Sequence, residues 1–247
     1  MIRARRTFIG CLLALLVGSF SVTANAQQQQ NAWNVSLLGG ANFITSDIEG
    51  DLISPGITSM PAGHDPAAGF FVGTAAAYTV DLGSNWSLDL EAEVSYRRNS
   101  ADDTIVAGVS FNSLGITTDG YVSNVSLMVN AIAAYQITET GFMPFIGGGA
   151  GVAFVNANVD NTDGGVTLNL VDDSDTAFAY QLIAGVAYKF TPNLIVATEY
   201  RFFGVAGTEF DTNPAVFVAG TKFEADGFQS NSIMLRLTYR FSLGSRP

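Results

Sequence analysis

Residues 86–97 read Trp-Ser-Leu-Asp-Leu-Glu-Ala-Glu-Val-Ser-Tyr-Arg, and this stretch decides the fold. Every second residue from Trp86 to Tyr96 is apolar or aromatic. The residues between them form the other face and are Ser87, Asp89, Glu91, Glu93, Ser95 and Arg97. Side chains alternate between two faces in this way only in a β-strand, because an α-helix would distribute the charges around its circumference. The segment is therefore predicted to be a strand with one apolar and one charged face.

Seven further segments of the chain show the same alternation. They cover residues 33–43, 70–80, 121–135, 144–151, 180–190, 194–202 and 233–241. The predicted connections are three short turns, at 81–85, 137–141 and 191–193, and four long loops, at 45–69, 99–120, 156–175 and 204–226. Short turns at one end and long loops at the other are typical of outer-membrane barrels. We therefore predict an all-β fold, an eight-stranded antiparallel up-and-down transmembrane β-barrel with short periplasmic turns and four long extracellular loops.

Alternation alone does not say whether the apolar face meets lipid or a dry core, and a soluble lipocalin-like barrel or a β-sandwich has the same period. The spacing of the aromatic residues favours lipid. Trp33 and Phe43 lie ten residues apart, as do Trp86 and Tyr96. Ten residues at a rise of about 3.3 Å, tilted by about 40°, span roughly 25 Å, the height of a lipid-facing band. The predicted aromatic girdle comprises Trp33, Phe43, Trp86, Tyr96, Tyr121, Tyr135, Tyr180 and Phe190.

The N-terminus predicts export. Three arginines, Arg3, Arg5 and Arg6, precede an apolar stretch at residues 8–17, and Ala-Asn-Ala at 24–26 supplies a site for signal peptidase. We expect a cleaved signal peptide over residues 1–26 and one barrel domain over residues 27–247. The Arg-Arg pair leaves both the general secretory route and the twin-arginine route open.

Composition excludes several classes of function. Removing the three signal arginines from 11 basic residues leaves 8 against 22 acidic residues, a net charge of −14. Such a chain is not expected to bind nucleic acid. The only cysteine, Cys11, lies in the signal peptide, and no later segment holds 18 consecutive apolar residues, so neither disulfides nor transmembrane helices are expected.

Two stretches resemble a known family. Residues 144–151, Pro-Phe-Ile-Gly-Gly-Gly-Ala-Gly, are similar to the glycine-rich fifth strand of small outer-membrane barrels of the OmpA/opacity-like type. Residues 178–193, continuing through 199–204, resemble the bacterial surface-antigen branch of that superfamily. The final strand, with Tyr239 and Phe241, resembles the signal that the barrel-assembly machinery reads, although six residues follow Phe241 here. The resemblance implies location in the Gram-negative outer membrane, with membrane lipid and the assembly machinery as partners.

The inward-facing charged side chains are the main candidate site. They are Asp89, Glu91, Glu93, Arg97, Lys189, Glu199, Arg201, Arg236 and Arg240, four acids and five bases. An eight-stranded barrel is only wide enough inside to be filled by side chains, and unpaired charges would be costly there. We expect a network of ion pairs across the lumen. Two interpretations stay open: a structural plug, or a narrow path for ions or small solutes.

No catalytic residue, metal site or cofactor is predicted. His64 is the only histidine and lies in the first long loop without a positioned serine. The acidic clusters of the loops, such as Asp172, Asp173 and Asp175, lack the ligand order of a calcium loop. The leading hypothesis is therefore a non-enzymatic surface protein whose rigid barrel displays acidic loops to a host or environmental ligand. The alternative is a small porin-like channel.

Overall fold

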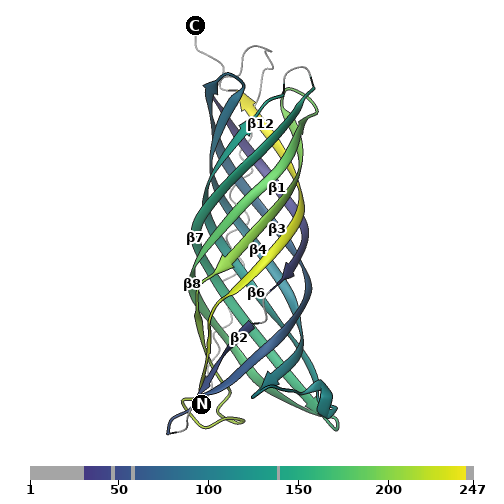
Figure 1. The fold of residues 1–247 in the computed structure, drawn as a ribbon, viewed down its shortest axis with the longest axis vertical. Helices are drawn as coiled ribbons and strands as arrows, with labels where there is room; N and C mark the ends of the chain where they lie inside the picture. The colour runs from purple at the N-terminus through teal and green to yellow at the C-terminus, as the bar shows by residue number, and fades with distance from the viewer. Residues whose placement is uncertain (1–30, 46–47, 57–58, 138–139, 243–247) are drawn as a thin grey trace.

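A computed structural model of the chain describes residues 31–45, 48–56, 59–137 and 140–242. Figure 1 shows a tall closed barrel of tilted strands, with its short turns at the top and its long hairpins at the bottom. The predicted signal peptide, residues 1–26, lies outside the described residues. Among the residues that are described, no helix is long and apolar enough to cross a membrane.

Eight strands form the ring of the barrel. They are β1 (Ala32–Ile44), β3 (Met60–Gly83), β4 (Trp86–Val106), β6 (Thr117–Tyr135), β7 (Phe142–Asp163), β8 (Val166–Lys189), β9 (Leu194–Val205) and β12 (Phe228–Ser242). Each pairs antiparallel with its neighbours, and the ring closes because β1 pairs with both β3 and β12. The predicted eight-stranded antiparallel barrel is thereby confirmed. Closure leaves no free strand edge in the ring, which a bilayer would not tolerate.

The apolar side chains of this ring point outward. Leu37, Val129 and Leu182 are 62%, 70% and 61% exposed, although each lies in the middle of a strand. The charged residues of the same strands point inward, and Glu91 and Arg201 are 2% and 0% exposed. A water-soluble barrel would place these two sets the other way round, so the soluble alternative is wrong. We call the part of the ring to which β1, β9 and β12 contribute the main barrel.

The segments predicted as long loops are largely strands, so the predicted extent of the loops was wrong. Residues 156–175 belong to β7 and β8, which are joined by a two-residue turn at Gly164 and Gly165. Both glycines have positive φ angles, 54° and 86°, which suits this tight connection. Most of residues 99–120 likewise lie in β4 and β6, with β5 (Val109–Ser110) and the one-turn helix η1 (Asn112–Leu114) between them.

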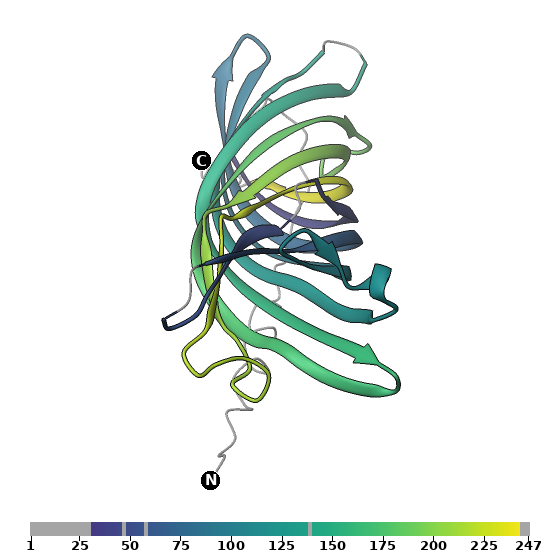
Figure 2. The same ribbon diagram turned by 60° about the horizontal axis from the view of Figure 1, so that its bottom comes forward.

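These hairpins continue the barrel beyond the main ring. Three short strands replace strands of the main ring here: β2 (Ile48–Ile53) replaces β1, β11 (Lys222–Ala225) replaces β12, and β10 (Thr208–Asp211) replaces β9. The resulting order is β10-β11-β2-β3, and the long strands β4, β6, β7 and β8 form the rest of the wall. Figure 2 brings this end forward and shows the β7–β8 hairpin projecting from the wall. We call this extension the distal barrel.

The distal barrel closes between β8 and β10 without a continuous ladder. β9 stops pairing with β8 at Val205. Beyond that point one bridge joins Val171 to Thr212. The carboxylates of Asp173 and Asp175 accept hydrogen bonds from the backbone N–H groups of Asp211 and Glu209, at 2.8 and 2.9 Å. Side-chain carboxylates therefore supplement the few backbone hydrogen bonds along this seam, which run from Ala206 N–H to the carbonyl of Phe178 and from Asn213 N–H to that of Leu170.

Candidate functional site

Five charged side chains meet across the lumen of the main barrel. Arg201 lies between two carboxylates, with Nη1 2.5 Å from Oε2 of Glu93 and Nε bonded to Glu199. Arg236 bonds the other oxygen of Glu199 at 2.8 Å and Oε2 of Glu91 at 2.5 Å. Because β4 and β9 lie on opposite sides of the ring, the cluster spans the lumen. We call these five residues the ion cluster.

Neutral side chains complete the hydrogen bonding of the ion cluster. The Asn130 amide donates to Glu91 and Glu93, at 2.9 and 3.1 Å. Gln181 donates to Asn130 at 2.7 Å and accepts from Arg201 at 3.2 Å. Such donors matter because a buried charge is tolerated only when it is paired and hydrogen-bonded.

The glycine-rich segment of β7 makes room for this arrangement. A Cβ atom on Gly149 would lie 1.9 Å from Oδ1 of Asn130, a clash that the buried amide could not relieve without losing its bonds. A Cβ on Gly151 would lie 1.9 Å from the carbonyl oxygen of Leu127 on β6. Here glycine is required because the neighbouring strand and its side chains approach the β7 backbone closely.

Arg97 lies next to the ion cluster and is held differently. Its guanidinium lies 3.7 Å from the ring centroid of Phe203 and 4.6 Å from that of Phe71. Its Nη1 donates to Ser95 and Ser126. Among the described residues no carboxylate lies within ion-pair distance of Arg97. The ion cluster holds three acids and two bases, and Arg97 is the third base that makes the total charge of this region neutral. The aromatic faces attract the cation without supplying a counter-charge.

The remaining predicted lumen charges do not join the cluster. Asp89 and Arg240 line a cavity at the end of the lumen that carries the short turns. Lys189 lies at the rim of the barrel, on the same alternation as the inward residues Ile183 and Ala187, and its side chain is exposed there. Sequence reasoning missed Phe71 and Phe203. The alternation placed Gln181 on the face opposite Tyr180 and Leu182, but this uncharged side chain was not included in the predicted site.

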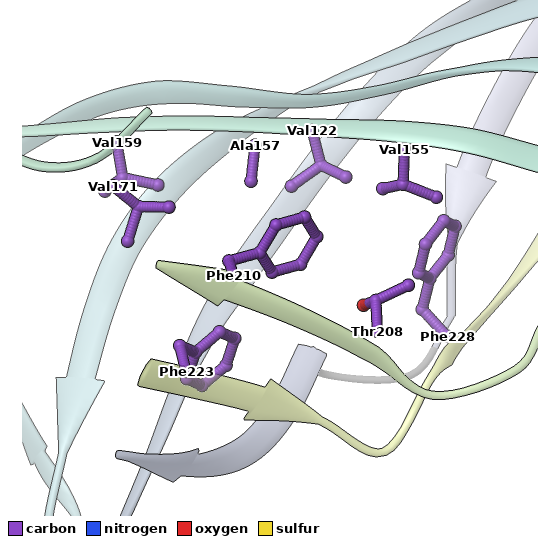
Figure 3. Close-up of a pocket in the computed structure, with 9 residues that line it drawn as sticks. All are labelled: Val122, Val155, Ala157, Val159, Val171, Thr208, Phe210, Phe223 and Phe228. Atoms are coloured by element: carbon purple, nitrogen blue, oxygen red, sulfur yellow. The ribbon is translucent and has the colours of Figure 1, made fainter. Parts of the chain in front are cut away.

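The interior of the distal barrel is apolar around three phenylalanines, whereas Thr104, Thr118 and Asn161 form a buried polar group farther along β4, β6 and β7. Figure 3 shows Phe210, Phe223 and Phe228 facing a wall of small β-branched and alanine side chains. The cavity between them is lined by Val122, Val155, Ala157, Val159, Val171, Thr208, Phe210, Phe223 and Phe228. It holds about 10 Å³ of space for the centre of a water molecule, which is room for about one water and no more. The side chains around this cavity are therefore closely packed.

Aromatic side chains lie in pairs on neighbouring strands at both ends of the outward apolar face. At the turn end the ring centroids of Trp33 and Tyr78 are 5.2 Å apart, and those of Trp86 and Tyr135 are 5.1 Å apart. The other pairs are Phe142–Tyr188 at the turn end, and Phe70–Tyr96 and Tyr180–Phe202 at the other end.

Three predicted girdle residues lie outside these pairs. Phe43 and Phe190 are exposed. Tyr121 lies farther out, opposite Asn158, and its ring packs under the guanidinium of Arg98 at 3.9 Å. At the end of β12, Tyr239 and Phe241 form an edge-to-face pair with centroids 4.8 Å apart.

The outward face of the distal barrel is acidic. Asp51, Glu224 and Glu209 are directly opposite one another on β2, β11 and β10, and Lys222 pairs with Glu209. Partial burial of Asp103 on β4 opposes ionisation, but hydrogen bonds from Ser110 and the backbone lower the pKa of this carboxyl below 3.8. Within the described parts of the chain no group of three or more histidine, cysteine or acidic residues is placed to hold a metal ion.

The chain matches the family model of the outer membrane protein beta-barrel domain over residues 12–241. No curated protein matches it. Among solved structures, a major outer membrane protein from Thermus thermophilus is 15% identical, with 85% of this chain and 100% of that chain covered and a TM-score of 0.51. OprG from Pseudomonas aeruginosa is also 15% identical, with 86% and 97% covered and a TM-score of 0.50. Neisserial surface protein A is 16% identical, with 85% and 97% covered and a TM-score of 0.42. At these identities the similarity establishes the fold alone.

Proposed function

This chain belongs to the family of outer-membrane protein β-barrel domains, and from that premise we propose that it is a closed, non-enzymatic barrel that displays the acidic distal barrel at the cell surface. The family places the protein in the Gram-negative outer membrane, so the turn end faces the periplasm and the distal barrel faces the medium. A host or environmental ligand is its proposed partner there. The acidic side chains of the displayed face favour a cationic ligand.

The packing of side chains inside the lumen supports this proposal. The ion cluster crosses the main barrel, and the three phenylalanines of the distal barrel pack over its outer mouth. Two successive layers therefore stand between the periplasm and the medium, one ionic and one apolar. An ion following this path would have to displace buried charges and then cross a dry apolar layer, and both steps are costly.

Single-channel recording on the refolded protein tests the closed lumen. We expect planar bilayers containing the protein to show no steady conductance. A double substitution, Glu93→Ala with Arg201→Ala, would remove the centre of the ion cluster, and Lys222→Ala on the exposed face is the matched control. Steady openings of the unmodified protein would contradict the proposal.

A small channel is the second candidate, and the cavity beside Asp89 favours it because that cavity reaches inward to Glu91 and Arg236 of the ion cluster. If the barrel conducts, Glu199→Gln should shift its ion selectivity toward anions, since the substitution removes a buried negative charge. Unchanged selectivity would argue against conduction through the lumen.

We also propose that β12 carries the contact with the assembly machinery. Tyr239 is 41% exposed and pairs with Phe241 at the periplasmic end of the final strand. Replacing both aromatic residues with alanine should lower the amount of protein in the outer membrane, and the same change at Phe142 and Tyr188 is the control. Equal losses from the two double variants would assign the effect to the aromatic girdle instead.

A further inference from the structure

A cavity opens at the periplasmic end of the lumen, on the far side of the ion cluster from the distal barrel. It holds about 60 Å³ of space for the centres of water molecules, enough for on the order of five water-sized groups. Glu91 and Arg236 line its inner end, so it is a blind pocket beneath the ion cluster. We call it the vestibule.

The two walls of the vestibule differ in chemistry. One wall is apolar and comes from β7, β8 and β9, where Met143, Ala187 and Ile195 pack together. The other wall is polar and comes mainly from β1, β4 and β12, where Asn34, Asp89 and Arg240 face the same space. Pockets that bind small molecules typically combine an apolar lining with a few convergent polar groups.

The polar wall holds an acid and a base that do not pair with each other. Among the described residues, Asp89 and Arg240 form no ion pair, either together or with another side chain, whereas the five residues of the ion cluster are all paired. Oδ1 of Asp89 is buried and has no hydrogen-bond partner. Arg240 donates from Nε to Asn34 at 3.2 Å. Asp89 is hydrogen-bonded to Thr79 and attracts Arg240 across the pocket, but among the described residues neither charge is in ion-pair contact with a partner.

We propose that the vestibule binds a small zwitterion, an α-amino acid about the size of alanine. Its ammonium group would meet Asp89 and its carboxylate would meet Arg240, so that each unpaired charge receives a charge-assisted hydrogen bond. Its apolar side chain would lie against Met143 and Ile195. This inference concerns the periplasmic side of the barrel and does not depend on the proposed surface role.

The ligand series tests the proposal on the unmodified protein. L-alanine is titrated into the refolded barrel in micelles of an uncharged detergent, and the NMR signals of Asn34 and Arg240 are followed. We expect a saturating shift in the millimolar range, as suits so small a ligand. Alanine amide lacks the carboxylate and N-acetylalanine lacks the ammonium group, so each should bind roughly tenfold more weakly or worse. Equal shifts with all three compounds, or no saturable shift up to about 100 mM alanine, would overturn it.

Variants assign the site. Asp89→Asn and Arg240→Gln should each weaken alanine binding by roughly tenfold or more. Asp81→Asn changes a charge at the same end of the barrel but outside the vestibule, and Lys222→Gln removes an exposed cation of the distal barrel; both should leave binding unchanged. Heat-modifiable gel mobility confirms that each variant is folded. If Asp89→Asn does not fold, Ala187→Leu, which fills the vestibule from its apolar wall, should abolish binding. Unaltered binding by this variant would place the ligand elsewhere and refute the proposal.

Discussion

The main barrel and the distal barrel share the same long strands, yet apolar side chains point outward in the main barrel and inward in the distal barrel. On β8, Leu182 and Val186 point outward from the main barrel while Gln181 points inward. Farther along the same strand, Val171 and Ala177 are buried inside the distal barrel, and Asp172 is exposed. The strand needs no change of backbone for this reversal, because the buried residues from Val171 to Ala187 all have odd numbers.

The reversal shows that the surroundings of a barrel set its interior. Lipid accepts apolar side chains on the outside, so the main barrel holds its charges inside and must pair them. Water surrounds the distal barrel, so its apolar residues are buried in the ordinary way, and its acids face outward. One closed sheet therefore has two interiors, an ionic one and an apolar one, and each should respond to a different kind of substitution.

Glu199→Ala should have the largest effect. Glu199 accepts from both Arg201 and Arg236, and its removal leaves two buried cations short of a partner. Breaking a buried ion pair costs about 3–5 kcal/mol of unfolding free energy. Urea unfolding in lipid, followed by tryptophan fluorescence, measures the change. Glu209→Ala, which breaks the exposed pair with Lys222, should leave the unfolding curve unaltered; equal curves for both variants would show that the ion cluster is not stabilising.

Phe223→Ala should weaken the distal barrel alone. Removing a buried phenylalanine side chain costs about 3 kcal/mol or more, and Phe223 belongs to the apolar cluster that fills the extension. We expect faster proteolysis of β10 and β11 and unchanged unfolding of the main barrel. Simultaneous loss of both parts would mean that the two interiors form one cooperative unit.

A charge on the outward face should distinguish the two environments on one strand. Ala184→Arg places a cation in lipid midway between Tyr180 and Tyr188 of the two girdles, which costs about 2–4 kcal/mol near the bilayer midplane. Ser174→Arg places the same cation on the outward face of the distal barrel, where the side chain is exposed. Only the first variant should unfold at lower urea concentration; similar midpoints for the two would contradict the assigned membrane boundary.

The seam between β8 and β10 should open when its carboxylates are removed. Asp173→Ala and Asp175→Ala each delete an acceptor for a backbone N–H of β10, worth about 1.5 kcal/mol. Hydrogen exchange of the Glu209 and Asp211 amides should accelerate, while amides of the β7–β8 ladder should not change. Unchanged exchange on β10 would show that the Val171–Thr212 bridge and the backbone hydrogen bonds beside it hold the seam without the two carboxylates.

The smallest expected effect is a local dependence on pH at Asp103. Its pKa is lowered in the folded protein, so its hydrogen bonds to Ser110 and Asn112 stabilise the turn above pH 3.8. As the pH falls through the lowered pKa, the carboxyl is protonated and this contribution is lost. Hydrogen exchange at residues 110–115 should therefore rise at low pH, and Asp103→Asn should remove the dependence. An equal pH response in that variant would assign it to another group.

The sequence predicted the main barrel well, because each of its strands meets lipid on one face and a polar lumen on the other. Residues 86–97 show this alternation without interruption, and the inward acids could be identified from it. The distal barrel was predicted as loops because its alternation reverses phase. On β7 the apolar residues are outward at Val152 and Phe154, then inward at Val155, Ala157 and Val159. The outward apolar face of β7 therefore ends at Phe154, and a single apolar face followed along the sequence would place the end of the strand there as well.

The partners within the ion cluster could not be predicted. Alternation indicates which residues face the lumen, but the stagger between strands decides which of them meet. Glu199 bonds both arginines and Arg97 bonds none of the acids, although all were expected in one network. Phe71 and Phe203, which hold Arg97 instead, are ordinary apolar residues in the sequence.

The reversal between lipid and water is tested most directly by spin labels placed in turn at the outward residues of β8, from Asp172 to Tyr188. Collision rates with oxygen, which concentrates in lipid, and with a nickel chelate, which stays in water, report the surroundings of each label. We predict that oxygen dominates at Tyr180, Leu182 and Val186, that nickel dominates at Asp172 and Ser174, and that the two cross near Phe178. Nickel accessibility at Leu182 equal to that at Ser174 would show that β8 does not pass from lipid into water between these residues.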